Sequence, residues 1–385
     1  MWLYKGFIFV KPLIMKPVFS CLLLLLMHSA LLSQSRFKTK NIFIITIDGF
    51  RWQEVYTGAD PALIANRKFV EDTSLMRQIY WDADPVVRRS KLLPFFWNVI
   101  AEKGQLYGNR LFDNKVNVKN IYKISYPGYS EILTGQTDPR IILNLPKNNN
   151  NINILEYLNN EKEYKGKVVA FSSWNMFPYI LNEERSRLAI NSGYEMIAET
   201  NSDSAFQFIN DVQDHIAHKT NTRYDWLTFL NAKEYIDQNH PRVIFLGFGE
   251  TDHFAHQARY DMYLQHAAAI DKMISDLWYY VQTNPFYKDQ TTFIITTDHG
   301  RGKSPSSWFT HLFFVGGSGQ TWIAMLGPDI IPAGEMKNNQ QIYQKQLAPT
   351  IAFLLGQNFK AAQWSKPILL PSVGESRNNE QLASK

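Results

Sequence analysis

Three apolar segments without polar alternation are the feature that most restricts how this chain can fold. They cover residues 41–47, 242–248 and 292–297. A strand has this composition when both of its faces are buried, as in a parallel sheet covered by helices on both sides. Each segment leads into aspartate or histidine, and α/β folds place their ligands at the carboxyl ends of such strands. We therefore predict an α/β fold with a mostly parallel central sheet and a functional site at that edge.

The residues that follow the three segments have the chemistry of metal ligands. Asp48 follows the first segment, and Asp298 and His299 follow the third. Asp252 and His256 follow the second, four positions apart, which puts both on one face of a helix. One such residue alone is more often a helix cap or a structural histidine. Three clusters together favour a divalent metal, and carboxylate and imidazole without thiolate suit zinc, manganese or iron.

A fourth segment supplies a candidate nucleophile. Residues 124–135 are typical of a turn followed by a short helix that Gly135 closes, with Ser125 near the helix N-terminus. Backbone N–H groups and the helix dipole favour an anion there, and a nearby metal would lower the pKa of the serine hydroxyl. The alternative is that Ser125 only caps the helix.

The order of these motifs resembles that of the alkaline phosphatase superfamily, and within it the type I phosphodiesterase/nucleotide pyrophosphatase branch and its bacterial relatives. The shared order runs from the strand-end Asp48 through the Ser125 turn, the Asp-x-x-x-His segment 252–256 and the Asp-His-Gly segment 298–300 to a late histidine. The resemblance covers nearly all of the chain after its N-terminal segment. It implies a three-layer fold with helices on both faces of the sheet and small cap elements over a two-metal site.

The resemblance also implies a metal pair, usually zinc, with manganese or magnesium as alternatives. The ligands that it implies for one ion are Asp252, His256 and His311. Those that it implies for the other ion are Asp48, Asp298, His299 and Ser125. In the implied reaction Ser125 attacks phosphorus, and the phosphoseryl intermediate that forms is then hydrolysed.

The segment after the nucleophile departs from the family. Nucleotide pyrophosphatases carry Asn-His where this chain has Gly128-Tyr129, so the asparagine that binds a phosphoryl oxygen is missing. An arginine beside a ligand could hold such an oxygen by a bidentate contact, although surface solvation is the commoner fate of arginine. The candidate substrate-binding residues are Arg51, Asn114, Lys115, Lys123, the backbone at Gly128, Tyr129 and Arg301.

Two other activities of the same superfamily fit the sequence less well. Formylglycine sulfatases need Cys/Ser-x-Pro-x-Arg, but the fifth position here is Tyr129 and the sole cysteine is Cys21. A cofactor-independent phosphoglycerate mutase acts in the cytoplasm, which the N-terminus argues against.

The N-terminus has the pattern of a secretory signal. From Met15 a basic start precedes an apolar stretch and a small-residue exit, so residues 1–33 are expected to be removed and Met15 is a possible true start. A signal anchor is the alternative. The mature chain would then be secreted or periplasmic, without cysteine and without a stable membrane anchor. We expect residues 34–385 to form one catalytic domain, with cap elements over about 173–215.

The composition and net charge of the chain restrict the classes of partner that it can bind. Net charge is +5 and 45% of residues are apolar, which is ample for a large core. We find no basic run of the kind that binds nucleic acid, whereas mild positive charge would attract a small anionic phosphate ester. The predicted function is a secreted two-metal phosphate-ester hydrolase, with diesters slightly favoured over monoesters. The alternatives are a phosphotransferase or mutase-like enzyme of the same fold, and a non-catalytic ligand-binding envelope protein.

Overall fold

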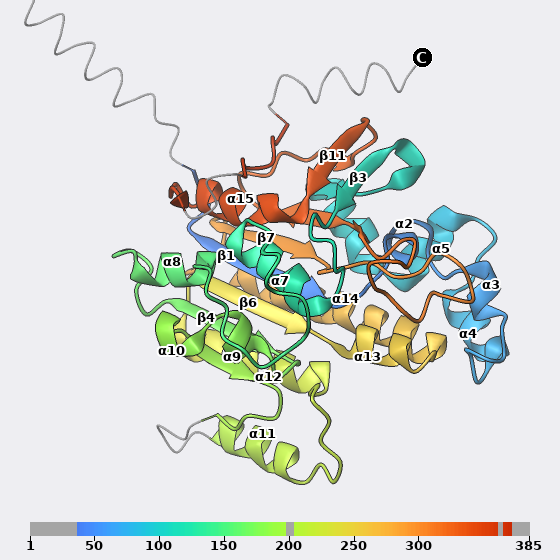
Figure 1. Ribbon diagram of the computed structural model, residues 1–385, viewed down its shortest axis with the longest axis horizontal. Coiled ribbons are helices and arrows are strands. Elements are labelled where there is room, and N and C mark those ends of the chain that lie inside the picture. The colour runs from blue at the N-terminus through green and yellow to red at the C-terminus, as the bar shows by residue number, and fades with distance from the viewer. Residues whose placement is uncertain (1–36, 198–203, 361–364, 372–385) are drawn as a thin grey trace, which may run out of the picture. The chain divides into compact units, whose positions relative to one another are not determined.

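The computed structural model describes residues 37–197, 204–360 and 365–371 (Figure 1). The expected signal segment 1–33, with Met15 and Cys21, lies outside these ranges. Residues Lys38–Lys385 group into one compact unit. Within the described ranges, no helix combines the length and apolar character that crossing a bilayer requires.

An eight-stranded sheet forms the centre of this unit, in the order β10-β2-β9-β7-β1-β6-β4-β5. The five strands from β7 to β5 run parallel, whereas β9 is antiparallel to its neighbours β7 and β2. The bounds are β1 Asn41–Ile47, β2 Gln105–Tyr107, β4 Val168–Ser172, β5 Ala189–Ser192, β6 Val243–Phe248, β7 Thr291–Thr296, β9 Ile323–Leu326 and β10 Gly334–Glu335. The predicted mostly parallel α/β sheet is confirmed.

The three apolar segments of the sequence are β1, β6 and β7, and they lie side by side. β1 pairs with β6 on one side and with β7 on the other, both in parallel register. Every residue of the three strands is buried. Because their carboxyl ends fall at the same sheet edge, residues some 200 positions apart in the sequence, such as Thr46 and Gly247, become neighbours.

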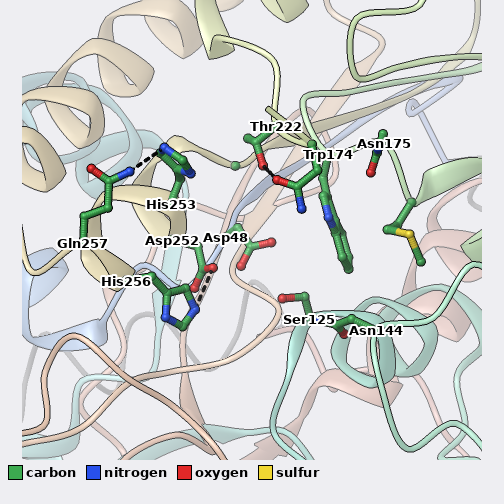
Figure 2. A pocket seen from close by; sticks show the side chains of 13 residues that line it. Asp48, Ser125, Asn144, Trp174, Asn175, Thr222, Asp252, His253, His256 and Gln257 are labelled. Carbon is green, nitrogen blue, oxygen red and sulfur yellow. Dashed lines mark hydrogen bonds and ion pairs between the residues drawn. The ribbon is translucent and has the colours of Figure 1, made fainter. Parts of the chain in front are cut away.

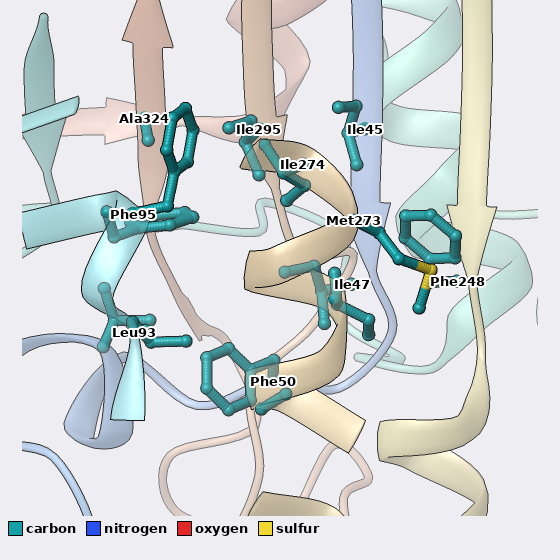
Figure 3. Close-up of a cluster of buried hydrophobic side chains, with 14 of the residues drawn as sticks. Ile45, Ile47, Phe50, Leu93, Phe95, Phe248, Met273, Ile274, Ile295 and Ala324 are labelled. Carbon is teal, nitrogen blue, oxygen red and sulfur yellow. The ribbon is translucent and has the colours of Figure 1, made fainter. Parts of the chain in front are cut away.

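The side chains of β1 alternate between two separate apolar cores. Ile45 and Ile47 enter one core, in which α14 (Tyr260–Thr283) also packs (Figure 3). Phe43 enters the same core, while Ile42 and Ile44 enter the other. The face of α14 that includes Ile274 is buried in the first of these cores. Burying a side chain of that size stabilises the fold by roughly 1.5–3 kcal/mol, so each core is a large contribution.

Helices cover both faces of the sheet, which gives the expected three layers (Figure 1). Those joining the first core are α2 Trp52–Thr57, α3 Pro61–Ile64, α4 Thr73–Tyr80, α5 Pro85–Leu92, η1 Phe96–Ile100, α12 Asp225–Asn239, α13 Glu250–His256 and α14 Tyr260–Thr283. Those joining the second are α7 Ser125–Thr134, α8 Ile154–Asn160, α9 Phe177–Ile180 and α15 Leu347–Leu354.

A smaller sheet and several short elements complete the unit. The smaller sheet has the order β11-β3-β8, with bounds β3 Asn114–Asn117, β8 Gln320–Thr321 and β11 Gln340–Tyr343. The short helices are α6 Ala101–Lys103, η2 Arg110–Phe112, α10 Glu183–Ser186, α11 Ser204–Asp214 and η3 Gln344–Gln346.

The stretch expected to form cap elements has two roles in the structure. Its strand β5 extends the central sheet by pairing with β4, and Phe177 is fully buried in the second core. Trp174, Asn175 and Met176, in contrast, line a pocket above the strand ends. The aromatic residues of this stretch are therefore divided between the core and the pocket.

Candidate metal centre

The ends of β1, β6 and β7 bring the strand-end residues together. The Nε2 atom of His299 lies 3.5 Å from Oδ1 of Asp48 and 3.4 Å from Oδ2 of Asp298. It lies 3.9 Å from Oδ1 of Asp252, which α13 carries just after β6. Figure 2 shows the carboxylates of Asp48 and Asp252 and the hydroxyl of Ser125 around one pocket.

Gly49 allows this close approach. Its φ is +59°, and a Cβ atom there would lie 2.6 Å from Oδ1 of Asp252. The Gly49 N–H donates to Oδ1 of Asp298 (3.1 Å), and the Thr251 hydroxyl donates to the backbone carbonyl of Asp48 (2.6 Å). A side chain at position 49 would therefore push apart the elements that carry the acidic residues.

Asp48, Asp298 and His299 form a first group with the character of a cation site. Oδ1 of Asp48 and Oδ2 of Asp298 are buried, and neither has a hydrogen-bond partner among the described residues. The His299 Nδ1–H donates to the Gly300 carbonyl (3.0 Å), which leaves the Nε2 lone pair facing the two carboxylates. Buried, unpartnered oxygen atoms are costly, and a divalent cation would satisfy them.

Asp252, His256 and His311 form a second group beside the first. The His256 Nε2 lies 3.2 Å from Oδ2 of Asp252 and 3.0 Å from Nε2 of His311, so the predicted one-face arrangement of Asp252 and His256 is confirmed. The His311 Nδ1–H donates to the Lys123 carbonyl (2.9 Å). Its Nε2 lone pair therefore faces the Nε2 of His256, an arrangement that a shared cation would stabilise.

Burial shifts the pKa values of Asp48, Asp298, His299 and His311. It raises the pKa of Asp48 well above its usual range and that of Asp298 to about 8, and the charges of neighbouring aspartates reinforce both shifts. Burial also lowers the pKa of His299 well below its usual range and that of His311 to about 4. Both imidazoles are therefore neutral at pH 7, as metal ligation requires.

Ser125 lies at the first group. It is the first residue of α7, Ile124 is the N-cap, and the Ser125 side chain is buried. Its Oγ lies 3.3 Å from the Nε2 of His299. The serine hydroxyl is therefore aimed at the strand ends.

The pocket over these groups has a volume of about 480 Å³. Its walls come from β-strand ends, α7, α13 and the loops at 144, 174–176 and 221–222. The lining residues are Asp48, Ser125, Asn144, Trp174, Asn175, Met176, Asn221, Thr222, Gly249, Asp252, His253, His256 and Gln257. Within this lining there is no lysine or arginine, so hydroxyl, amide and ring groups surround the acidic floor.

Neither arginine proposed from the sequence reaches the pocket. Arg51 is buried in an ion pair with Glu54, and its Nη1 donates to the Gly302 carbonyl (3.1 Å). Arg301 pairs with Asp252 and donates to two backbone carbonyls. The expectation that they hold a phosphate oxygen is not supported, because both guanidinium groups are already engaged by the protein.

Gly128 and Tyr129 also have structural contacts instead of pocket contacts. The Gly128 N–H donates to the Ile124 carbonyl (3.0 Å), and a Cβ atom there would lie 2.5 Å from the carbonyl oxygen of Asp298. The buried Tyr129 hydroxyl donates to Oδ2 of Asp48 (3.0 Å). Glycine is thus required for helix packing, and Tyr129 positions a candidate ligand, a role that sequence reasoning missed.

The three upstream alternatives are occupied as well. Asn114 accepts from the Gly108 N–H (2.8 Å), and Lys115 pairs with Asp113. The Lys123 ammonium donates to the Phe313 carbonyl (3.0 Å). None of these three side chains lines the pocket.

A family model described as type I phosphodiesterase / nucleotide pyrophosphatase matches residues 101–340. No curated protein matches.

Solved structures share the fold at low sequence identity. A mutant of the alkaline phosphatase PafA is 12% identical, with a TM-score of 0.57 over 88% of this chain and 100% of that chain. The lipoteichoic acid synthase LtaP from Listeria monocytogenes is 13% identical, with a TM-score of 0.54 over 83% and 72%. The phosphonate monoester hydrolase SpPMH from Silicibacter pomeroyi is 14% identical, with a TM-score of 0.53 over 86% and 76%.

Proposed function

The chain belongs to the type I phosphodiesterase/nucleotide pyrophosphatase family, within the alkaline phosphatase superfamily, and on this premise we propose that it hydrolyses phosphate esters with Ser125 as nucleophile. The observation that best supports the proposal is the position of the Ser125 Oγ, 3.3 Å from the Nε2 of His299 and beside two carboxylates that each have one oxygen without a partner among the described residues. A serine placed in this way needs only a cation to become a nucleophile.

We propose that the two groups hold two divalent ions, most simply zinc. One group is Asp48, Asp298 and His299, with Ser125, and the other is Asp252, His256 and His311. The support is the chemistry and proximity of the donors, which are imidazoles and carboxylates without a thiolate. When bound, the ions would supply the positive charge that lowers the pKa of the Ser125 hydroxyl and stabilises the phosphoryl oxygens.

The protein residues would act in two steps. In the first, the Ser125 hydroxyl gives its proton to water, its Oγ forms a bond to phosphorus while the bond to the leaving oxygen breaks, and the leaving alkoxide takes up that proton from the water. In the second, a water molecule attacks phosphorus and loses a proton, the Oγ–P bond breaks, and Ser125 Oγ takes up that proton. The position of Ser125 at the start of α7 favours both steps, because the positive end of the helix dipole lies near the negative charge that develops.

The pocket lining favours a diester over a monoester. A monoester carries two negative charges near neutral pH, and proteins usually meet such a group with arginine or lysine. The lining offers asparagine, glutamine, threonine and the Trp174 indole instead. Neutral donors match a singly charged diester, and the Trp174 indole offers a surface on which a flat leaving group could stack.

We propose further that the enzyme acts outside the cytoplasm. The support is the signal-peptide pattern of residues 1–33, which has a basic start, an apolar stretch and small residues near position 33. Amino-terminal sequencing of protein from the extracytoplasmic fraction should give a start near residue 34. Retention of residues 1–33 would instead support a signal anchor.

The test of the function combines metal analysis with four ester substrates. Purified protein is assayed with p-nitrophenyl phosphate, bis-p-nitrophenyl phosphate, p-nitrophenyl thymidine monophosphate and p-nitrophenyl sulfate, each with and without chelator. We expect bound divalent metal and chelator-sensitive cleavage, fastest for a diester. Ser125→Ala should abolish cleavage, whereas Ser90→Ala, on α5 and outside the pocket lining, should leave it unchanged. Full activity of Ser125→Ala would exclude the mechanism.

Transfer to an acceptor is tested in the same assay. If added alcohols compete with water for the phosphoryl group and dominate the products, the enzyme is a phosphotransferase. Metal-free protein that is inert to all four esters would favour a ligand-binding protein.

A further inference from the structure

Three surface loops expose large apolar side chains to solvent. The first loop covers residues 119–123, the second covers 139–147 and the third covers 311–315. Single exposed apolar residues are common on soluble proteins, whereas a contiguous patch of them marks a surface that a partner covers. The exposed apolar side chains of the three loops include Ile121, Ile142, Leu143, Leu145, Phe313 and Phe314.

Hydrogen bonds join the three loops. The Lys123 ammonium donates to the Phe313 carbonyl (3.0 Å), and the His311 Nδ1–H donates to the Lys123 carbonyl (2.9 Å), so the first loop is tied to the third. The Tyr122 hydroxyl donates to the Pro139 carbonyl (2.7 Å), which ties the first loop to the second. The six exposed apolar side chains therefore belong to one surface, which we call the apolar rim.

The apolar rim borders the mouth of the pocket over the candidate metal centre. In the second loop, Ile142, Leu143 and Leu145 are among the residues that line a small hollow of about 110 Å³. Asn144, between the two leucines, lines the larger pocket together with Ser125. In the third loop, the exposed residues follow directly after His311, a candidate ligand. A partner that covers the apolar rim therefore meets the entrance to the site.

The loops are fastened to the body of the protein in this exposed arrangement. The Tyr126 hydroxyl donates to the Lys147 carbonyl (2.6 Å) at the end of the second loop. In the third loop, the Leu312 N–H donates to the Ser318 hydroxyl (3.2 Å). A rearrangement that buried the apolar side chains inside the molecule would break these bonds and those between the loops. Cover for the apolar rim therefore has to come from outside the molecule.

The charge of the loops indicates the chemistry of the partner. Residues 119–123, 139–147 and 303–319 contain no aspartate or glutamate. Asp138, just before the second loop, pairs with Arg140 (2.6 Å). The Lys303 N–H donates to the Gly316 carbonyl (3.2 Å), which places this lysine beside the third loop. The apolar rim is therefore flanked by cationic side chains, which are those of Lys119, Lys123, Lys147 and Lys303.

We propose that the apolar rim docks on a lipid surface that carries anionic headgroups. Its aliphatic and aromatic side chains enter the boundary between headgroups and acyl chains, and the lysines stay at the level of the lipid phosphates. A second copy of this chain is the competing occupant, but a twofold interface would bring the same lysines face to face, and their repulsion disfavours it. The inference goes beyond the proposed function, because docking requires no ester cleavage.

The experiment measures binding to phosphatidylcholine vesicles, with and without phosphatidylglycerol, by co-sedimentation. It uses the chain from residue 34, because residues Lys38–Lys385 form one compact unit that contains both apolar cores. Omitting residues 1–33 removes an apolar segment that would itself bind lipid. We expect binding that phosphatidylglycerol strengthens and that high salt weakens, because salt screens the attraction between lysines and headgroups.

Phe314→Ser tests the apolar contribution, and Phe208→Ser is its matched control. Phe314 is 69% exposed on the apolar rim, and Phe208 is 66% exposed on α11, outside the three loops. Phe314→Ser should weaken vesicle binding by about 10-fold or more, because a phenyl group is no longer transferred out of water. Phe208→Ser should leave binding unchanged. Lys303→Gln should weaken binding to the anionic vesicles by roughly fivefold. The three variants should keep the Tm of the wild type, since all three side chains are exposed.

Several results would overturn the inference. One is a wild type that binds neither kind of vesicle, and another is binding that phosphatidylglycerol does not strengthen. Equal losses in Phe314→Ser and Phe208→Ser would show that binding is not specific to the apolar rim. A dimer in light scattering that Phe314→Ser dissociates, without vesicle binding, would assign the apolar rim to a second copy. If the protein cleaves no ester but its vesicle binding depends on Phe314, the proposed function fails and this inference stands.

Discussion

Two clusters of the same residue types, each with two carboxylates and a histidine, lie in this molecule and differ in how completely they are hydrogen-bonded. One is Asp48, Asp298 and His299, and the other is Asp225, Glu250 and His266. In the first, a buried oxygen of each carboxylate has no partner among the described residues.

The second cluster is satisfied by the protein itself. The Asp225 carboxylate accepts from the N–H groups of Gly249 (2.8 Å) and Glu250 (3.1 Å) and from the Ser173 hydroxyl (2.6 Å). Glu250 accepts from the Asp225 N–H (2.7 Å), and its Oε2 lies 3.2 Å from Nδ1 of His266. Composition alone therefore does not identify a metal site. The comparison supports the proposal that the first cluster holds metal, whereas the contacts of the second fix the start of α13, the helix that carries Asp252.

The largest expected effect is at the unpartnered cluster. Asp298→Asn should reduce both bound metal and ester hydrolysis, the latter by about 1000-fold or more, because a neutral amide is a poor ligand and the reaction depends on the cation. Metal analysis and kcat/KM measure the two effects. Asp276→Asn, at an exposed residue paired with Lys272, is the matched control. If Asp298→Asn retained both bound metal and activity, the first cluster would not differ from the second in its need for metal.

Asp225→Ala should act on stability instead. Removing the carboxylate leaves the Gly249 and Glu250 N–H groups and the Ser173 hydroxyl without their acceptor, at a cost of about 3 kcal/mol in the free energy of unfolding. Denaturant titration measures this cost. The refolded variant should still bind as much metal as the wild type. If Asp225→Ala lost one metal ion without any loss of stability, we would infer that the second cluster is a metal site.

Tyr129→Phe tests the contact that holds Asp48 at the first cluster. Phenylalanine fills the same space but removes the hydrogen bond to Oδ2, which should weaken metal affinity by roughly 10-fold, up to 100-fold. Competition with a chromophoric chelator measures the affinity. Tyr279→Phe, at a residue that is 72% exposed, serves as the control. Equal affinities in wild type and Tyr129→Phe would show that the cluster does not need this bond.

The last expected effect is the pH dependence of stability, which belongs to the second cluster. Burial, reinforced by the charge of Glu250, raises the pKa of Asp225 from 3.8 to about 7, so the native state binds more protons than the unfolded state between these values. The contribution of Asp225 to the free energy of unfolding is therefore complete below about pH 4 and is lost as the pH rises through about 7. Between these values the free energy of unfolding falls with a slope approaching 1.4 kcal/mol per pH unit. Denaturant titrations of the wild type and of Asp225→Ala across this range should show a slope that the variant lacks. If the contribution of Asp225 to the free energy of unfolding increased with pH, the pKa of Asp225 would not be raised in the folded state.

Part of the fold and of the site could be predicted from local patterns. The unbroken apolar runs at β1, β6 and β7 identified the parallel strands, and the residues after each run identified Asp48, Asp252 and Asp298. These predictions succeed because strand burial and strand-end chemistry are encoded within a few adjacent residues. The side chains of Arg51 and Arg301 could not be placed in the same way, since their partners Glu54 and Asp252 were not known to be in reach.

The walls of the pocket were beyond sequence reasoning for a related reason. Asn144 lies in a loop that contains several asparagines, and nothing in its neighbours distinguishes it. Only the hydrogen bond from the Tyr126 N–H, between two segments that the chain path brings together, sets its amide orientation. The Asp225 cluster was missed similarly, because its three residues come from α12, α13 and α14.

The sequence by itself determined the class of fold, the family, and the residue types that can form a metal and nucleophile site, because burial of strands and ordered motifs are properties of short segments. The tertiary structure decided which polar atoms remain without partners. That property depends on every neighbour within hydrogen-bond distance, and in this protein those neighbours come from strands and loops far apart in the chain. It separates Asp298 from Asp225.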